Sequence, residues 1–213
     1  PTGPRVEGFF DPATSTVSYL VVDPATRRCA IVDSVLDFDA RSGRTSRAGA
    51  DRLIARVREL GAQVDWILET HVHADHLTAA PYLKDALGGR IAIGRAITTV
   101  QETFGRLFGA GPEFARDGRQ FDRLFDDGER FAIGELPARA MHTPGHTPGH
   151  LSFYAARCGV LFAGDSLRTL GGRLRVSSGP NTADEALARA SAERQLALRP
   201  RLICTGHGPA VAP

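Results

Sequence analysis

The chain has 213 residues, of which 42% are hydrophobic, and a formal net charge of +2 at pH 7. These values suit one globular domain over residues 1–213 with a substantial core, and the small charge argues against a nucleic-acid-binding surface. No apolar run reaches the length of a membrane span, and no signal peptide opens the chain. The three cysteines are widely spaced, as is typical of reduced thiols. We therefore expect a cytoplasmic protein without nucleic-acid or membrane partners.

The first half of the chain is predicted to alternate strands and helices. Short β-branched apolar runs predict strands over 16–22, 29–32, 64–68 and 90–93. The polar, glycine-containing stretch 37–47 predicts a loop. Apolar residues at helical spacing predict helices over 49–60 and 77–87, which Gly61 and Gly88 end.

Residues 97–119 predict a mixed helix and loop with several large apolar side chains. These side chains either pack into the core or line a substrate entrance, and we expect packing because large apolar residues are usually buried. The residues concerned are Phe104, Leu107, Phe108 and Phe114.

The second half repeats the pattern of strands followed by a helix. Short apolar runs predict strands over 121–125, 130–133, 138–141, 151–155, 160–163 and 202–204. The sequence from Thr182 to Glu185 matches a capping box and predicts a helix that runs to about Leu198. Two successive groups of strands and helices favour an α/β fold with two β-sheets covered by helices.

A dense group of metal-binding residue types follows the predicted strand over 64–68. Four such residues lie within six consecutive positions, namely His71, His73, Asp75 and His76. Histidine is the commonest metal ligand. Three further candidates each follow a predicted strand, namely His146, Asp165 and His207. Because strand ends on one rim of a sheet converge, the seven residues predict an enzyme site for one or two metal ions. His142 and His150 are expected at most to support this site through hydrogen bonds.

The His71-x-His73-x-Asp75-His76 run with its three downstream partners resembles the metallo-β-lactamase superfamily. That resemblance implies a four-layer αββα sandwich with the metal site at one edge. Residues 6–165 also resemble persulfide (sulfur) dioxygenases, many of which are called β-lactamase-hydrolase-like proteins. The segments that carry this narrower resemblance are 9–16, 31–37, 68–77, 91–94, 121–122 and 142–150.

The narrower resemblance implies oxidation of glutathione persulfide, or a similar low-molecular-weight persulfide, to sulfite with O₂. It places one Fe(II) on His71, His146 and Asp165, a set that leaves positions open for O₂ and substrate. His73, Asp75, His76 and His207 then lie around the iron, and Asp75 and His76 are the expected catalytic residues. The expected partners are a small thiol or persulfide and O₂, and a homodimer is one option for the oligomeric state.

The last quarter of the chain departs from that pattern. The segments 166–175 and 205–209 resemble general hydrolases of the superfamily, so the chain is interpreted as a natural or engineered recombinant joined near 160–166. Arg168 and Arg173 are candidate anchors for a substrate carboxylate.

A zinc hydrolase is the alternative interpretation, because all the residues that it needs are present. In a site with two Zn(II), one ion takes His71, His73 and His146, and the other takes Asp75, His76 and His207, with Asp165 between them. Two ions lower the pKa of a bridging water, which then attacks an ester, lactone, thioester or lactam.

Overall fold

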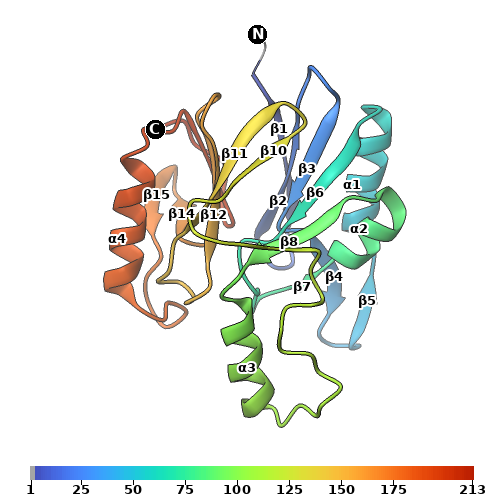
Figure 1. Ribbon diagram of the computed structural model, residues 1–213, viewed down its shortest axis with the longest axis vertical. Helices are drawn as coiled ribbons and strands as arrows, with labels where there is room; N and C mark the ends of the chain where they lie inside the picture. The colour runs from blue at the N-terminus through green and yellow to red at the C-terminus, as the bar shows by residue number, and fades with distance from the viewer. Residues whose placement is uncertain (1–2) are drawn as a thin grey trace.

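The computed structural model describes residues 3–213. Its two larger β-sheets pack face to face with helices on both outer faces (Figure 1), and two smaller sheets of two and three strands accompany them. The first sheet has the order β1 (Arg5–Asp11), β2 (Thr16–Val22), β3 (Arg28–Val32), β6 (Gln63–Leu68), β8 (Arg90–Gly94) and β9 (Arg123–Phe125). The second has the order β10 (Arg130–Ile133), β11 (Leu136–His142), β12 (Leu151–Ala155), β13 (Val160–Gly164) and β16 (Leu202–Thr205). Helices α1 (Ala48–Glu59) and α2 (Ala80–Leu87) cover the first sheet, and α4 (Glu185–Leu196) covers the second. These layers confirm the predicted αββα sandwich.

Strand β2 shows why the sheet is buried on both faces. Leu20 belongs to the apolar cluster that holds Leu53 of α1 and Leu83 of α2. Its neighbour Val21 belongs to the cluster between the sheets, with Trp66. Because successive strand residues point to opposite faces, an unbroken apolar run fits this doubly covered position. Each large side chain that is fully buried there stabilises the fold by about 1.5–3 kcal/mol. Trp66 also joins the sheets, since its Nε1 donates a hydrogen bond of 2.8 Å to the carbonyl of Ala132.

Parallel pairing brings the candidate ligands to one edge of the sandwich. Strand β3 runs parallel to β6 in the first sheet, and β13 runs parallel to β16 in the second. Asp33, His71, Asp165 and His207 lie just beyond the carboxyl ends of these four strands. The carboxyl ends of parallel strands meet at the same edge, which is where α/β proteins commonly bind their ligands.

Residues 37–47 form a hairpin, so the predicted loop is wrong. Strand β4 (Val35–Asp39) pairs with β5 (Arg44–Ser46) and also with the short strand β7 (Leu77–Thr78). The helix predicted over 77–87 therefore begins only at Ala80, where Pro81 suits a first helical turn. The prediction also missed the partly exposed strands β1, β14 (Leu167–Leu170) and β15 (Arg173–Val176), because strands with few apolar residues give a weak sequence signal.

The start of α4 differs from the predicted capping box. The N-cap is Asp184, whose Oδ1 accepts hydrogen bonds of 2.9 Å from the amides of Ala186 and Leu187. Thr182 instead places its Oγ1 2.8 Å from Ser177 Oγ. The expected cap was wrong because aspartate caps a helix as well as threonine does. The predicted end of α1 is confirmed, since Gly61 follows the helix with φ of 58°.

The expected packing of the large apolar residues after position 97 is wrong. Helix α3 (Ile97–Leu107) buries Ile97, Gln101 and Gly105 and projects beyond the sheets at the bottom of Figure 1. This position leaves Phe104, Leu107, Phe108 and Phe114 exposed by 46%, 69%, 76% and 38%.

Two further predictions concern the cysteines, expected to be reduced thiols, and the absence of a membrane-spanning segment. Cys29 and Cys204 are buried and Cys158 is partly buried, and all three are free thiols. Within residues 3–213, the longest apolar helical stretches fall short of what a membrane crossing needs.

Candidate metal centre

His71, His146 and Asp165 form a compact group at the edge of the sandwich, with ligand atoms within 4.8 Å of one another. They follow β6, β11 and β13, respectively. Asp165 Oδ2 lies 3.8 Å from His71 Nε2 and 3.5 Å from His146 Nε2. All three side chains are largely buried. Two imidazoles and a carboxylate that converge in this way form a candidate site for one ion.

Hydrogen bonds orient both imidazoles and fix the tautomer of His71. His71 Nδ1 lies 2.9 Å from Thr70 Oγ1, and the Thr70 hydroxyl donates to Asp33 Oδ2 at 2.9 Å. Thr70 must therefore accept the Nδ1 proton of His71. His146 Nδ1 makes a similar contact of 3.2 Å to Ser177 Oγ. The Nε2 of His71 is left with a free lone pair, and it is buried without a hydrogen-bond partner within residues 3–213. A buried lone pair without a partner is costly, and a metal ion would satisfy it.

The protonation states also suit a metal. Burial lowers the pKa of His71 well below its usual value, and burial likewise lowers the pKa of His146 despite the opposing charge of Asp165. Burial alone would raise the pKa of Asp165, but the hydrogen bond from His207 and the charge of His207 hold it far below its usual range. Neutral imidazoles beside an ionised carboxylate are the forms that bind metal ions.

Residues for a second ion lie on the other side of Asp165. His207 Nε2 lies 3.3 Å from Asp165 Oδ2 and 3.4 Å from Asp75 Oδ2, while its Nδ1 donates to the carbonyl of Ser15 at 3.0 Å. His76 Nδ1 donates to the carbonyl of Leu77 at 2.9 Å. Its Nε2 is buried and without a partner among the residues that the structure describes. His73, Asp75 and His76 also form a group within 4.8 Å.

His73 is engaged by two buried carboxylates. Its Nε2 lies 3.2 Å from Glu69 Oε2 and 3.3 Å from Asp33 Oδ1. Burial lowers the pKa of His73, but the two carboxylates outweigh burial and raise this pKa well above its usual value. The sequence analysis missed both acidic partners, although Glu69 and Asp33 each stand at the end of a predicted strand. The Nε2 of His73 therefore faces these two acids, whereas the Nε2 atoms of His71 and His146 face Asp165.

The loop that carries Asp165 is held from two sides. His150 is fully buried, and its Nε2 accepts a hydrogen bond of 3.1 Å from the Asp165 amide. Its Nδ1 lies 2.8 Å from Thr143 Oγ1. On the other side, a Cβ atom added to Gly206 would overlap Asp165 Oδ1. Glycine at position 206 therefore provides the space that the carboxylate occupies.

Two pockets meet at the candidate centre. The first, here named the α3 pocket, has a volume of about 770 Å³ and is lined by His71, His73 and His146, by α3 and by the following loop. The second, here named the polar pocket, has a volume of about 700 Å³ and is lined by Asp165, His207, Arg168 and residues 177–182. Arg173, the other expected anchor, lies on the exposed strand β15 and outside the lining of both pockets.

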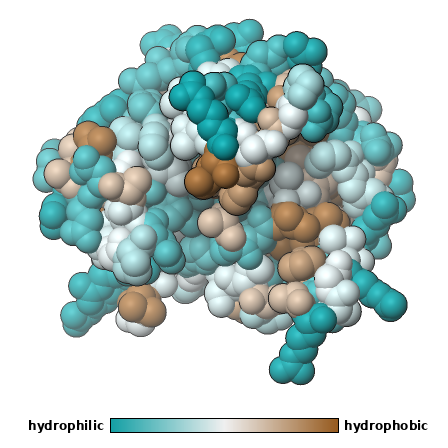
Figure 2. Space-filling model, turned by 90° about the horizontal axis from the view of Figure 1, so that it is seen from below, coloured by the Kyte–Doolittle hydropathy of each residue, from teal (hydrophilic) through white to brown (hydrophobic). Residues whose placement is uncertain are grey.

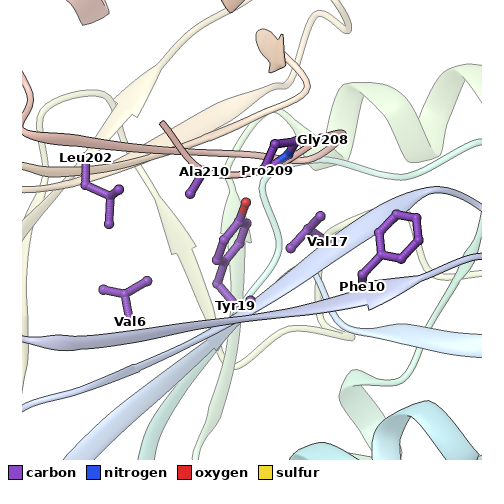
Figure 3. Close-up of a pocket in the computed structure, with 9 residues that line it drawn as sticks. Val6, Phe10, Val17, Tyr19, Leu202, Gly208, Pro209 and Ala210 are labelled. Carbon is purple, nitrogen blue, oxygen red and sulfur yellow. The ribbon is translucent and has the colours of Figure 1, made fainter. Parts of the chain in front are cut away.

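A third hollow of about 540 Å³ lies between the first two strands and the C-terminal segment. Figure 3 shows Val6, Tyr19 and Val17 on one side and Leu202 and Pro209 on the other. Within the part of the chain that the structure describes, none of the seven candidate ligands lines this hollow.

Comparison with known proteins identifies the family. The Metallo-beta-lactamase superfamily matches residues 11–207. A probable metallo-hydrolase of Burkholderia pseudomallei (strain 1710b) is 61% identical over 170 residues, which cover 76% of this chain and 58% of that protein. The mitochondrial persulfide dioxygenase ETHE1 of Homo sapiens is 29% identical over 159 residues, which cover 75% of this chain and 51% of that protein.

Solved structures show the same fold. The crystal structure of ETHE1 from Myxococcus xanthus has a TM-score of 0.69 at 24% identity, covering 98% of this chain and 79% of that one. Our chain spans 58% and 51% of the lengths of the two curated relatives above. Members of the superfamily include both hydrolases and an oxidoreductase. The matched residues and the arrangement of the candidate ligands establish that the chain belongs to the metallo-β-lactamase superfamily.

Proposed function

We propose that the chain is a mononuclear Fe(II) dioxygenase that oxidises a low-molecular-weight persulfide, such as glutathione persulfide, to sulfite. One persulfide, one O₂ and one water give one thiol, one sulfite and two protons. The observation that carries the proposal is the compact group of His71, His146 and Asp165, beside which the Nε2 of His73 faces two buried carboxylates. Two imidazoles and one carboxylate are typical of non-haem Fe(II) oxygenases, because they leave coordination positions open.

The unpaired Nε2 and the fixed tautomer of His71 fit such an ion. When bound, Fe(II) supplies the redox chemistry that O₂ needs. The protein orients the ligands through Thr70 and Ser177. In this proposal the carboxylate of Asp75, which lies 3.4 Å from His207 Nε2, receives protons that the reaction releases.

A two-zinc hydrolase is the second candidate, and a specific observation favours it. Asp75 and His207 lie beside Asp165, and the buried Nε2 of His76 is also free to bind an ion. The Burkholderia relative is named a probable metallo-hydrolase. In this alternative, Asp165 lies between the two ions and the substrate is an ester, lactone, thioester or lactam.

Oxygen uptake tests the proposal. Protein loaded anaerobically with Fe(II) is mixed with glutathione persulfide in an oxygen-electrode cell, and sulfite is quantified at the end. We expect equal amounts of O₂ consumed and sulfite formed. If zinc-loaded protein hydrolyses a thioester while iron-loaded protein consumes no O₂, the proposal is wrong and the hydrolase is supported.

A further inference from the structure

We infer that the α3 pocket binds an apolar organic group of the substrate, so the preferred persulfides carry an uncharged alkyl or aryl chain. This inference rests on the proposed function and specifies the substrate class of the same site. It differs from the expectation of glutathione persulfide, whose organic part carries two carboxylates and an ammonium group.

The lining of the α3 pocket offers almost no free polar group away from the metal centre. Its described lining residues include no lysine, arginine, aspartate or glutamate. Gln101 Nε2 donates to Gln120 Oε1 at 2.9 Å, and Gln101 Oε1 accepts from the Gly118 amide at 3.0 Å. Gln120 Nε2 donates to the carbonyl of Ala115 at 2.7 Å. A carboxylate that lay against this part of the pocket, away from the metal centre, would lose part of its hydration without gaining a counter-charge, which is unfavourable.

Aromatic side chains form the outer wall of the pocket. The rings of Phe104 and Phe108 stack with centroids 5.8 Å apart, and Phe114 lines the same space. All three are exposed to solvent in the structure, and exposed apolar groups that cluster in this way commonly mark a binding site. Figure 2 shows apolar surface beside a hollow on the face seen from below, which is the side toward which α3 projects in Figure 1. The volume of about 770 Å³ suits an organic ligand and far exceeds the needs of O₂ alone.

The unpaired polar atoms of the pocket lie at its inner end. Among the described lining residues, the buried side-chain atoms without a hydrogen-bond partner are His71 Nε2 and Thr147 Oγ1. Thr147 follows the candidate ligand His146 and lines both pockets. A ligand with a sulfur group at one end and an apolar chain at the other matches this polarity, because its sulfur reaches the centre while the chain lies against the phenylalanines.

Thiols of increasing chain length test the inference without turnover. Iron-loaded protein is titrated anaerobically in a calorimeter with ethanethiol, butanethiol, hexanethiol and glutathione. We expect the affinity to rise about three- to fourfold for each added methylene that is buried, and hexanethiol to bind more tightly than glutathione. Affinity that is independent of chain length, or tighter binding of glutathione than of hexanethiol, overturns the inference.

A pair of variants on α3 tests where the alkyl chain of the thiol binds. Phe104→Glu places a charge in the pocket wall and is expected to weaken hexanethiol binding at least about tenfold. Leu107→Glu introduces the same charge three residues later on the same helix, at a more exposed position outside the pocket lining, and is expected to leave the affinity unchanged. Equal effects of the two substitutions contradict the inference.

The results separate this inference from the proposed function. A steep dependence on chain length in a protein that consumes no O₂ supports the apolar pocket and rejects the dioxygenase. Oxygen uptake with glutathione persulfide together with a flat thiol series supports the dioxygenase and rejects the apolar pocket.

Discussion

The α3 pocket and the polar pocket share His146 and Thr147 but differ in chemistry. The α3 pocket is built from a helix and loop inserted between β8 and β9. The polar pocket is built largely from the segment after Asp165, which supplies Arg168 and residues 177–182. The candidate ligands come from strand ends, whereas both pocket walls come from connecting segments. The strands of the sandwich therefore position the candidate metal ligands, while the connecting segments determine which substrate reaches them.

The polar pocket also bears on the hypothesis of recombination near 160–166, which stays a prediction. The segment after the expected junction contributes Ser177, which contacts His146 from the preceding part of the chain. Four substitutions, taken in order of decreasing expected effect, test how the two sides of the centre divide their roles.

The largest effect is expected for a ligand of the proposed iron. His71→Ala removes one of three ligands and should reduce bound iron from one per chain to nearly none. His76→Ala is the matched control, because it removes an imidazole that binds a metal only in the two-metal alternative. Metal analysis of the purified variants measures both. Equal metal loss in the two variants would favour a two-metal site.

Gly206→Ala is expected to reduce turnover strongly without removing any functional group. The added methyl group would overlap Asp165 Oδ1 and displace the carboxylate. A displacement of about 1 Å commonly costs about 100-fold in rate. The rate constant of iron-loaded protein measures this effect, and thermal unfolding serves as the control for general damage. Unchanged turnover would mean that the position of Asp165 is not critical.

Ser177→Ala is expected to weaken metal binding by about tenfold, because partners that orient a metal ligand typically contribute 10- to 100-fold. It removes the hydrogen-bond partner of His146 Nδ1. Ser178→Ala alters the next residue of the same pocket lining and is the matched control. Competition with a chelator of known affinity measures both variants. Similar affinities in the two would show that the contact to Ser177 does not support His146.

The smallest effect is expected for Arg168→Ala. Its exposed guanidinium lines the polar pocket, where an interaction with a carboxylate is worth a factor of about three. We expect KM for glutathione persulfide to rise by that factor and KM for hexyl persulfide to stay constant. Arg173→Ala, on the paired strand outside the pocket, is the control. An equal rise for both substrates would place the organic chain in the polar pocket.

The sequence predicts the strongly apolar elements well and the polar ones poorly. Strand β2 is apparent from its unbroken apolar run, and helix α1 is apparent from the helical spacing of its buried residues. Strands β5 and β15 are largely exposed and β14 is only four residues long, so their backbone pairing leaves little trace in the sequence. The cap at Asp184 was missed because several residues in that segment could cap a helix.

The residues of the candidate site likewise include some that could be predicted from the sequence and some that could not. His71, His146 and Asp165 could be predicted because metal-binding residue types follow predicted strands. The roles of Glu69 and Asp33 could not, since their effect on His73 depends on burial and on distances between separate strands. The open position of Phe104 also depends on how α3 projects from the sandwich, which its amphipathic pattern does not specify.

Metal quantification of the intact protein tests the central claim most directly. The chain is produced in medium that supplies both iron and zinc, and its metals are counted per chain by mass spectrometry. The compact group of His71, His146 and Asp165, with His73 held by carboxylates, predicts one iron per chain. Two zinc ions per chain would contradict the mononuclear iron site and favour the hydrolase.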